Sequence, residues 1–268
     1  MADKTIVFIT GANTGIGYEA VKALLQSPKA YHVLLGSRSV EKGKEAVSQV
    51  TKEYPDTKST VELVQIDISD DASIHEAVAT IKGKFDRLDC LVNNAGASFD
   101  TTFANDESRF RQIFNQAWDT NVAGTQVLTY ACVPLLLAAQ APRLIFLTSG
   151  LSTLEGASKA LHPFRPNPAA GWPKKDVFAA VGYRSSKAGL NMTMLIWHNI
   201  LQEDGVKVFC ISPGFLATGL GGVGPEALKA MGAGEAWLGG DIIKRVVDGE
   251  RDADAGKVVA QNGVVQPW

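Results

Sequence analysis

The sequence predicts an α/β fold in which helices cover both faces of a doubly wound parallel sheet of about seven strands. Short apolar runs alternate with helix-like segments, as in repeated βαβ units. Most runs are apolar without interruption, which is typical of strands covered on both faces. The expected strands are Thr5–Thr10, His32–Gly36, Val61–Ile66, Cys90–Val92, Leu144–Thr148, Val206–Ile211 and Lys257–Ala260.

Apolar residues between the strands recur at helical spacing. Ile16, Ala20 and Leu24 are four residues apart, and we expect their helix to stop near Pro28. The segment Phe178–Leu201 is the most apolar of these stretches and predicts a largely buried helix. Candidate N-caps for the helices between them are Ser39, and then Ser69 or Asp70.

Residues 151–176 interrupt this alternation. They contain four prolines and two glycines, which favour an irregular loop over a helix or strand. Loops of this length are usually functional or mobile. No linker divides the chain, so we expect a single domain over residues 1–268 with this Pro-rich loop inserted in it.

Composition argues against several classes of protein. The net charge is −2 and no basic cluster carries interleaved aromatic residues, so we expect neither nucleic acid nor a membrane surface as a partner. We identify no secretion signal and no apolar run near 18 residues, the length of a membrane span. The three cysteines lie in apolar runs and are expected to be reduced and buried, which fits a cytoplasmic location. The four histidines are scattered, so no metal site is predicted.

A glycine-rich turn follows the first expected strand and precedes a helix, which is where a dinucleotide-binding turn belongs. Gly11 would allow the tight turn, Gly15 the close approach of a pyrophosphate, and Gly17 the packing of helix on strand. The spacing G-x-x-x-G-x-G departs from the usual G-x-G-x-x-G, and a merely flexible turn is the alternative. The turn makes the predicted fold Rossmann-type, with phosphate-binding residues Gly11, Asn13, Thr14, Gly15, Ile16 and Gly17.

The end of the second expected strand favours NADP(H) over NAD. NAD sites usually carry an acid here for the ribose 2′-hydroxyl, but this strand runs into Ser37 and Arg38. Arg38 can form a charge-assisted pair with a 2′-phosphate, and Ser37 can add a hydroxyl donor. A solvated surface arginine is the alternative interpretation.

Polar residues follow several other expected strands, and the carboxyl ends of parallel strands are where open α/β sheets bind ligands. Tyr183 and Lys187 are four residues apart and so share one helix face. Each motif alone is weak, but the ordered set is specific: Asn93-Asn94-Ala95-Gly96, Asn121, Ser149, Tyr183 with Lys187, and Pro213-Gly214.

This ordered set resembles the classical short-chain dehydrogenase/reductase family, from Thr10 to about Thr218. The resemblance implies a catalytic tetrad of Asn121, Ser149, Tyr183 and Lys187, in which Asn121 would position a water and Lys187 would also hold the nicotinamide ribose. It implies further cofactor contacts at Asp67, Ile68, Asn94, Ala95, Gly96, Pro213, Gly214 and Thr218, and the arginine after the second strand is the family's NADP(H) signature.

The chemistry of these residue types agrees with those roles. A free tyrosine has a pKa of about 10, too high for an efficient acid or base at neutral pH. We expect the Lys187 cation and an oxidised nicotinamide to lower the pKa of Tyr183. Tyr183 could then protonate a carbonyl oxygen as hydride reaches its carbon, while Ser149 stabilises the developing charge. The alternatives are that Tyr183 is a structural tyrosine of the core and that Ser149 is an ordinary turn residue.

The stretch between Ser149 and Tyr183 is longer than in usual family members and resembles carbonyl reductases with an insertion before the catalytic helix. That insertion puts the usual family tetramer in doubt, so we expect a monomer or homodimer. We also expect the insertion to wall the substrate pocket, although a surface insertion is the alternative. Large apolar residues expected nearby suggest a bulky, apolar or aromatic ketone: Phe99, Phe103, Phe164, Trp172, Phe215, Leu216, Met231, Trp237 and Leu238.

The sequence therefore predicts an NADPH-dependent carbonyl reductase acting on a small molecule. Two other classes stay open, because a fold does not fix a function. One is a specialised or non-redox enzyme, such as an epimerase, on the same scaffold. The other is an NADP(H)-binding sensor, against which the intact tetrad argues.

Overall fold

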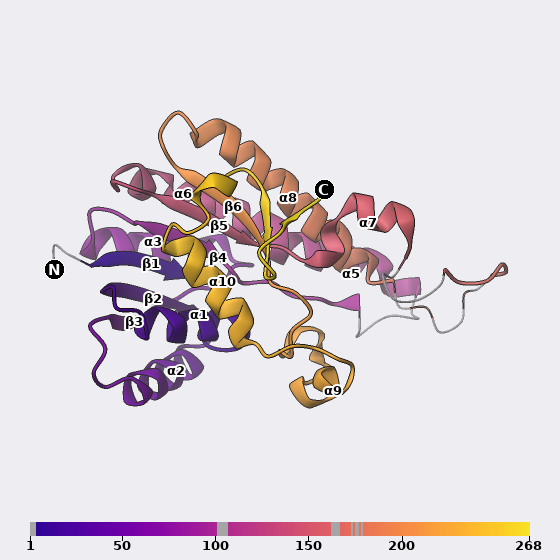
Figure 1. Ribbon diagram of the computed structural model, residues 1–268, viewed down its shortest axis with the longest axis horizontal. Coiled ribbons are helices and arrows are strands. Elements are labelled where there is room, and N and C mark those ends of the chain that lie inside the picture. The colour runs from indigo at the N-terminus through magenta and orange to yellow at the C-terminus, as the bar shows by residue number, and fades with distance from the viewer. Residues whose placement is uncertain (1–3, 101–106, 162–166, 173, 175–176, 178) are drawn as a thin grey trace.

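The computed structural model describes residues 4–100, 107–161, 167–172, 174, 177 and 179–268, and these form one eight-stranded sheet with helices on both faces (Figure 1). The strand order is β3-β2-β1-β4-β5-β6-β7-β8, parallel except for the antiparallel pair of β7 and β8. The predicted Rossmann-type fold is confirmed. The strands are β1 (Thr5–Ile9), β2 (Tyr31–Ser37), β3 (Thr60–Gln65), β4 (Cys90–Asn93), β5 (Arg143–Leu147), β6 (Lys207–Ser212), β7 (Val258–Ala260) and β8 (Val265–Gln266).

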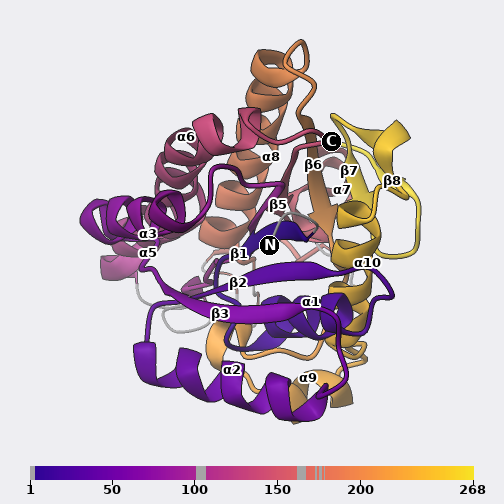
Figure 2. The same cartoon turned by 90° about the vertical axis from the view of Figure 1, so that its left-hand side faces the viewer.

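Two layers of helices sandwich this sheet, as Figure 2 shows. One buried apolar cluster joins α3, α6 and α8 to one face, and a second joins α1, α2 and α10 to the other. The helix bounds are α1 (Gly15–Leu25), α2 (Val40–Glu53), α3 (Asp71–Lys84), α5 (Phe110–Trp118), α6 (Gly124–Leu137), α7 (Leu154–Lys159), α8 (Val181–Leu201), α9 (Pro225–Ala230) and α10 (Trp237–Val247).

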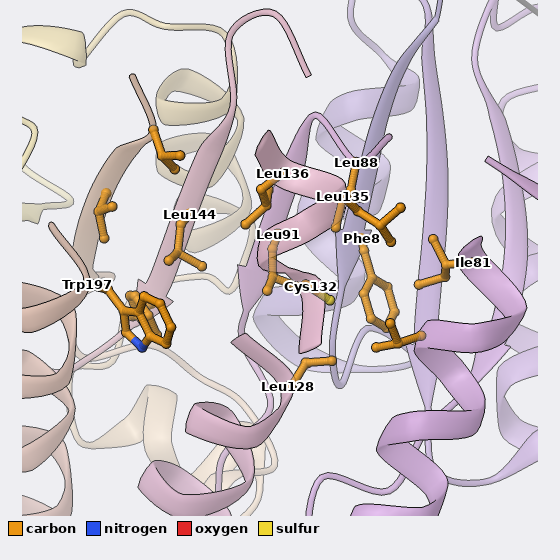
Figure 3. Packing of buried hydrophobic residues seen from close by; sticks show 14 of the residues in the cluster. Phe8, Ile81, Leu88, Leu91, Leu128, Cys132, Leu135, Leu136, Leu144 and Trp197 are labelled. Carbon is orange, nitrogen blue, oxygen red and sulfur yellow. The ribbon is translucent and has the colours of Figure 1, made fainter. Parts of the chain in front are cut away.

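Alternation along the strands builds both clusters. In β1, Phe8 faces the α3–α6–α8 side while its neighbours Val7 and Ile9 face the other side, and all three are fully buried. Figure 3 shows Phe8 among Leu91 and Leu128 in the first cluster. The three cysteines are buried and free, as expected, and burial raises the pKa of the Cys132 thiol to about 12.

Local signals account for most helix ends. Ser39 caps α2 by accepting a hydrogen bond from the N–H of Lys42 at 3.3 Å, and Asp70 caps α3 through the N–H of Ala72 at 3.0 Å. The helix predicted from Phe178 begins at Val181, and residue 178 itself lies outside the described residues. Among the described residues, no helix is both long and apolar enough to cross a bilayer.

Part of the Pro-rich segment is helical, so the prediction of an irregular loop throughout 151–176 was wrong. Thr153 supplies the N-cap of α7, because its Oγ1 accepts a hydrogen bond from the N–H of Gly156 at 3.1 Å. The prolines begin at Pro163, after α7 has ended, and therefore do not oppose its formation.

A short π-helical turn at Asp119–Ala123 joins α5 to α6 and brings α6 very close to the end of β3. A Cβ atom on Gly124 would lie 1.7 Å from the carbonyl oxygen of Ile68, whereas one on Gly83 in α3 would have no neighbour within 4 Å. Gly124 is therefore required by close backbone packing.

We predict that Gly124→Ala lowers the free energy of unfolding by about 3 kcal/mol or more, because backbone on both sides must move. Gly83→Ala is the matched control and should raise that free energy by about 0.5–1 kcal/mol, since alanine is the better helix former. Urea unfolding followed by circular dichroism measures both. Equal effects of the two substitutions would contradict the packing described for Gly124.

Candidate active site

The predicted site residues gather at the carboxyl edge of the sheet. The turn after β1, the segment 94–100 after β4, Ser149 after β5 and Pro213 after β6 all lie at this edge, and α8 lies against it.

The turn between β1 and α1 has the features of an anion site. Gly11 and Gly15 adopt φ values of 61° and 58°, which favour glycine. A Cβ on Gly17 would lie 2.5 Å from Nδ2 of Asn94, so this position has no room for a side chain. Thr14 occupies the N-cap of α1 without a capping hydrogen bond from its side chain. The start of α1 thus suits a phosphate group.

The other predicted residues of this turn are at least partly exposed, and the loop after β6 lies next to the turn. Asn13 and Ile16 are partly exposed and Thr14 is exposed. A Cβ on Gly15 would lie 3.7 Å from Cβ of Thr218, so the loop after β6 reaches the phosphate turn. In that loop Pro213 is buried, and Gly214 is exposed with a φ of 93°.

Asn94 fastens the end of β4 to the phosphate turn. Its Nδ2 donates hydrogen bonds to the carbonyl oxygens of Thr10 at 2.8 Å and Gly11 at 3.1 Å. The backbone N–H groups of Asn94 and Ala95 donate to Oγ1 of Thr10. The side chain of Asn94 and the backbone of Asn94 and Ala95 therefore hold the end of β4 against the phosphate turn.

Arg38 is the exposed cation at the end of β2. Its side chain is 78% exposed, and its Nε lies 3.9 Å from Oδ2 of Asp67, which brings two predicted cofactor residues together. Ser37 is buried and donates its hydroxyl to the carbonyl oxygen of Ser39 at 2.9 Å. Ile68 is also buried. The exposed polar group at the end of β2 is therefore the Arg38 guanidinium, because the Ser37 hydroxyl is bonded to the backbone.

Tyr183 and Lys187 form a buried pair on α8. They are 8% and 4% exposed, and Nζ of Lys187 lies 5.8 Å from the centre of the Tyr183 ring. This Nζ donates a hydrogen bond to the carbonyl oxygen of Leu147 at 2.8 Å. A Cβ on Gly96 would lie 3.1 Å from Nζ and 3.0 Å from Oδ1 of Asn121. Because Gly96 has no side chain, the space beside Nζ of Lys187 and Oδ1 of Asn121 stays open.

Burial decides the charge state of this pair. It raises the pKa of the Tyr183 phenol above its usual value, and a hydrogen bond with Ser149 opposes the rise. Burial also lowers the pKa of Lys187 to about 8. Burial is thus the largest influence on the Tyr183 pKa in this structure, and the lowering by the Lys187 cation together with an oxidised nicotinamide stays a prediction. The phenol is therefore protonated at neutral pH.

Asn121 lies on the π-helical turn and joins two segments of the site. Its Oδ1 accepts from the N–H of Ala97 at 2.8 Å, and its Nδ2 donates to the carbonyl oxygen of Ala97 at 2.9 Å. The same Nδ2 donates to Oγ of Ser186 at 2.9 Å, and Ser186 in turn donates to the carbonyl oxygen of Tyr183 at 2.8 Å. Asn121 thus connects the segment after β4 to α8.

A buried polar network holds the backbone of Ser149, and the sequence did not predict it. Thr148 donates to Oδ1 of Asn191 at 2.6 Å, and Nδ2 of Asn191 donates to Oγ of Ser152 at 2.9 Å. Ser152 donates to the carbonyl oxygen of Ser149 at 2.6 Å. Thr148 and Ser152 flank Ser149 in the segment after β5, whereas Asn191 lies in α8, so no local spacing indicates the network. No spacing indicates the role of Ser186 either.

The expected apolar pocket residues differ widely in exposure. Phe215, Met231 and Trp237 are exposed, while Leu216 is buried and Phe99 and Leu238 are partly buried. Trp172 is 87% exposed. The predicted pocket residues Phe103 and Phe164 lie outside the described residues.

A cavity of about 1100 Å³ lies on the outer face of α8, away from Tyr183 and Lys187. It is lined by residues of α5, α6 and α8, among them Trp118, Tyr130, Met192, Ile196 and Ile200.

Comparison with known proteins identifies the family. The family model of short chain dehydrogenases matches residues 5–161. This chain is a short-chain dehydrogenase/reductase. It is 44% identical over 268 residues to the short-chain dehydrogenase/reductase tropE of Talaromyces stipitatus, covering 100% of this chain and 99% of that protein. It is also 44% identical to eupG of Phoma sp, covering 99% and 98% of the two chains.

Solved structures share the fold of this short-chain dehydrogenase/reductase. An NADPH-bound carbonyl reductase from chicken fatty liver superposes with a TM-score of 0.78 at 23% identity, over 99% of each chain. The carbonyl reductase Sniffer of D. melanogaster gives a TM-score of 0.75 at 23% identity, over 99% of this chain and 100% of the other. The family is one of oxidoreductases that act on small molecules, so the coarse function is a redox reaction.

The buried amine should destabilise the cofactor-free protein at neutral pH. Above pH 10.5 Lys187 is neutral in both folded and unfolded chains. Between about pH 10.5 and 8 unfolded chains take up a proton that the folded protein does not, so stability falls as pH falls. Below pH 8 Lys187 is charged in both folded and unfolded chains, and the full free-energy cost of burying the charged amine remains. A shift of this size corresponds to about 3 kcal/mol.

We therefore predict that Lys187→Met is more stable than wild type at pH 7 by about 2–3 kcal/mol. The difference should shrink as pH rises from 8 towards 10. Urea unfolding of both proteins without cofactor at pH 7 and pH 9.5 measures it. A gap that widens with pH would contradict the depressed pKa.

Proposed function

We propose that this enzyme uses NADPH to reduce a ketone or other carbonyl compound to an alcohol, with Tyr183 as the proton donor. The buried Tyr183–Lys187 pair beside Gly96 and Ser149 carries the proposal. A phenol kept protonated by burial suits an acid that completes a reduction.

The preference for NADP(H) rests on Arg38. An exposed guanidinium at the end of β2 complements the charge of a 2′-phosphate, and no acid occupies the strand end itself. Asp67 at 3.9 Å is near enough to orient Arg38 without burying it. One protein of similar fold, from Shigella flexneri, was solved with NADP, and another, a Brucella melitensis reductase, with NAD. The similar folds therefore do not decide between the two cofactors.

We assign a separate role in the reduction to each of four residues. Bound NADPH would supply the hydride that reaches the carbonyl carbon. The Tyr183 hydroxyl gives its proton to the carbonyl oxygen, and the Ser149 hydroxyl donates a hydrogen bond to the same oxygen as charge develops. Lys187 would hold the nicotinamide ribose. Asn121 keeps the segment after β4 against α8 and positions a water that returns a proton to Tyr183.

The substrate that we propose is a bulky apolar or aromatic ketone. Phe215, Met231 and Trp237 expose large apolar surfaces on the segments that follow β6. A panel of ketones that includes acetophenone, benzil and 2-butanone, followed by NADPH absorbance, tests this choice. Faster reduction of the aromatic members is expected, and turnover of 2-butanone alone would overturn it.

Tyr183→Phe removes only the phenol hydroxyl and so tests the acid directly. We expect kcat for ketone reduction to fall by about 10²–10⁴-fold, because the carbonyl oxygen loses its proton donor. NADPH binding, measured by fluorescence titration, should be unchanged.

Tyr130→Phe is the matched control, since Tyr130 is exposed on α6 and distant from the pair. It should keep wild-type turnover. Retained ketone reduction in Tyr183→Phe would favour a non-redox or differently catalysed reaction, and cofactor binding without turnover of any ketone by wild type would favour a sensor.

Arg38→Glu tests the cofactor preference. The introduced carboxylate repels the 2′-phosphate, so we expect the Kd for NADPH to rise by about 100-fold or more while the Kd for NADH changes little. Lys44→Glu makes the same charge change at an exposed position of α2 and serves as the control. A ratio of the two affinities that is equal in Arg38→Glu and wild type would refute the assignment of Arg38.

A further inference from the structure

Asp100 lies at the end of the segment that follows β4, and its carboxylate faces the start of α8. The residue is buried, and its two carboxylate oxygens accept hydrogen bonds from the N–H groups of Gly182 at 3.0 Å and Tyr183 at 2.8 Å. One of these N–H groups belongs to the proposed proton donor itself. Asp100 therefore touches the backbone of Tyr183 but is separated from it by 83 residues of sequence.

The helix that carries Tyr183 has no cap of its own. Ala180 occupies the N-cap position with φ 47° and ψ 43°, and its methyl group cannot accept a hydrogen bond. The first backbone bond of the helix runs from the N–H of Arg184 to the carbonyl oxygen of Ala180 at 2.8 Å. The N–H groups before it need acceptors from outside the helix. A carboxylate is well suited because the start of a helix carries partial positive charge.

Local packing leaves little freedom at this contact. A Cβ on Gly182 would lie 3.4 Å from both carboxylate oxygens of Asp100 and 2.8 Å from Cγ2 of Ile113 in α5. The glycine thus lets the carboxylate approach the first turn of α8, and Ile113 closes the other side.

Three residues of the segment 94–100 join it by hydrogen bonds to other parts of the site. Asn94 binds the carbonyl oxygens of the phosphate turn, Ala97 exchanges two hydrogen bonds with Asn121, and Asp100 binds the backbone of Tyr183. One short stretch of chain therefore fixes the cofactor turn relative to the proton donor.

We propose that Asp100 is a positioning residue, which sets the place of the Tyr183 hydroxyl by capping the first turn of α8 from the segment that lines the cofactor cleft. The catalytic part of this inference rests on the proposed reductase function. Loss of the carboxylate leaves two buried N–H groups without these acceptors, so the first turn opens more often and Tyr183 leaves its productive position. Cofactor contacts made by β1, α1 and β2 stay in place.

The experiment compares wild type with Asp100→Ala, Asp100→Asn and Asp70→Ala. Asp70→Ala is the matched control, because it removes another aspartate N-cap, at α3, whose side chain accepts a hydrogen bond from Ala72 and from no predicted site residue. Three quantities are measured on each full-length protein: amide hydrogen exchange of residues 181–184 without ligand, NADPH affinity by fluorescence, and kcat with the panel ketone that wild type reduces fastest.

We expect exchange of the Gly182 and Tyr183 amides to rise by about tenfold or more in Asp100→Ala. We expect kcat to fall by about 10–100-fold with unchanged NADPH affinity, since misplacement of one group acts on the chemical step. Asp100→Asn retains one acceptor oxygen and should lie between Asp100→Ala and wild type in both exchange and kcat. Asp70→Ala should keep the wild-type kcat.

Wild-type exchange at residues 181–184 in Asp100→Ala would overturn the proposal. So would a fall in kcat that is equal in Asp70→Ala, or one that is matched by an equal loss of NADPH affinity, because each indicates a general loss of structure. If wild type reduces no ketone at all, the reductase function fails, and the exchange measurement still decides whether Asp100 holds the first turn of α8.

Discussion

The site depends on the burial of a phenol and an amine on one face of α8. Among the described residues no carboxylate forms an ion pair with Lys187, and its hydrogen bond goes to the carbonyl oxygen of Leu147. Burial therefore acts on both groups without a compensating charge: it raises the pKa of Tyr183 and lowers that of Lys187. Both shifts favour the neutral forms. A neutral phenol holds the proton that a carbonyl reduction consumes.

Backbone contacts hold this pair at the edge of the sheet. Asn94, Asn121 and Asp100 each direct side-chain hydrogen bonds to backbone groups of a different segment. Such bonds fix the positions of segments and depend little on side-chain rotamers elsewhere. The phosphate turn, the segment after β4 and the first turn of α8 consequently form one connected unit. The polar network of Thr148, Ser152 and Asn191 extends the same principle to the backbone of Ser149.

Features that repeat locally were predictable from the sequence. The seven parallel strands follow from continuous apolar runs, and the N-caps Ser39 and Asp70 follow from residue type and position. Tyr183 and Lys187 share a helix face because of their spacing, and the fold brings Gly96 and Asn121 to them. By contrast, β8 has two residues, too few for any periodicity, and α7 was hidden because the prolines that follow it dominate the composition of its segment.

Features that depend on tertiary contact were not predictable. Asp100 caps a helix that begins more than 80 residues later, and nothing near it in the sequence indicates that role. The burial that raises the pKa of Tyr183 could not be predicted from spacing, which indicates only that an amine lies nearby. The bond from the Ser37 hydroxyl to the carbonyl oxygen of Ser39 is local, and it was missed because this hydroxyl was considered only as a donor to a cofactor.

A crystal structure of the protein with NADP⁺ tests the central claim most directly. We predict that Nζ of Lys187 lies within about 3.2 Å of a hydroxyl of the nicotinamide ribose, and that the Tyr183 hydroxyl faces the nicotinamide ring from the same side as Ser149. A nicotinamide bound away from α8, or a Tyr183 hydroxyl turned from the ring with Lys187 in solvent, would contradict it.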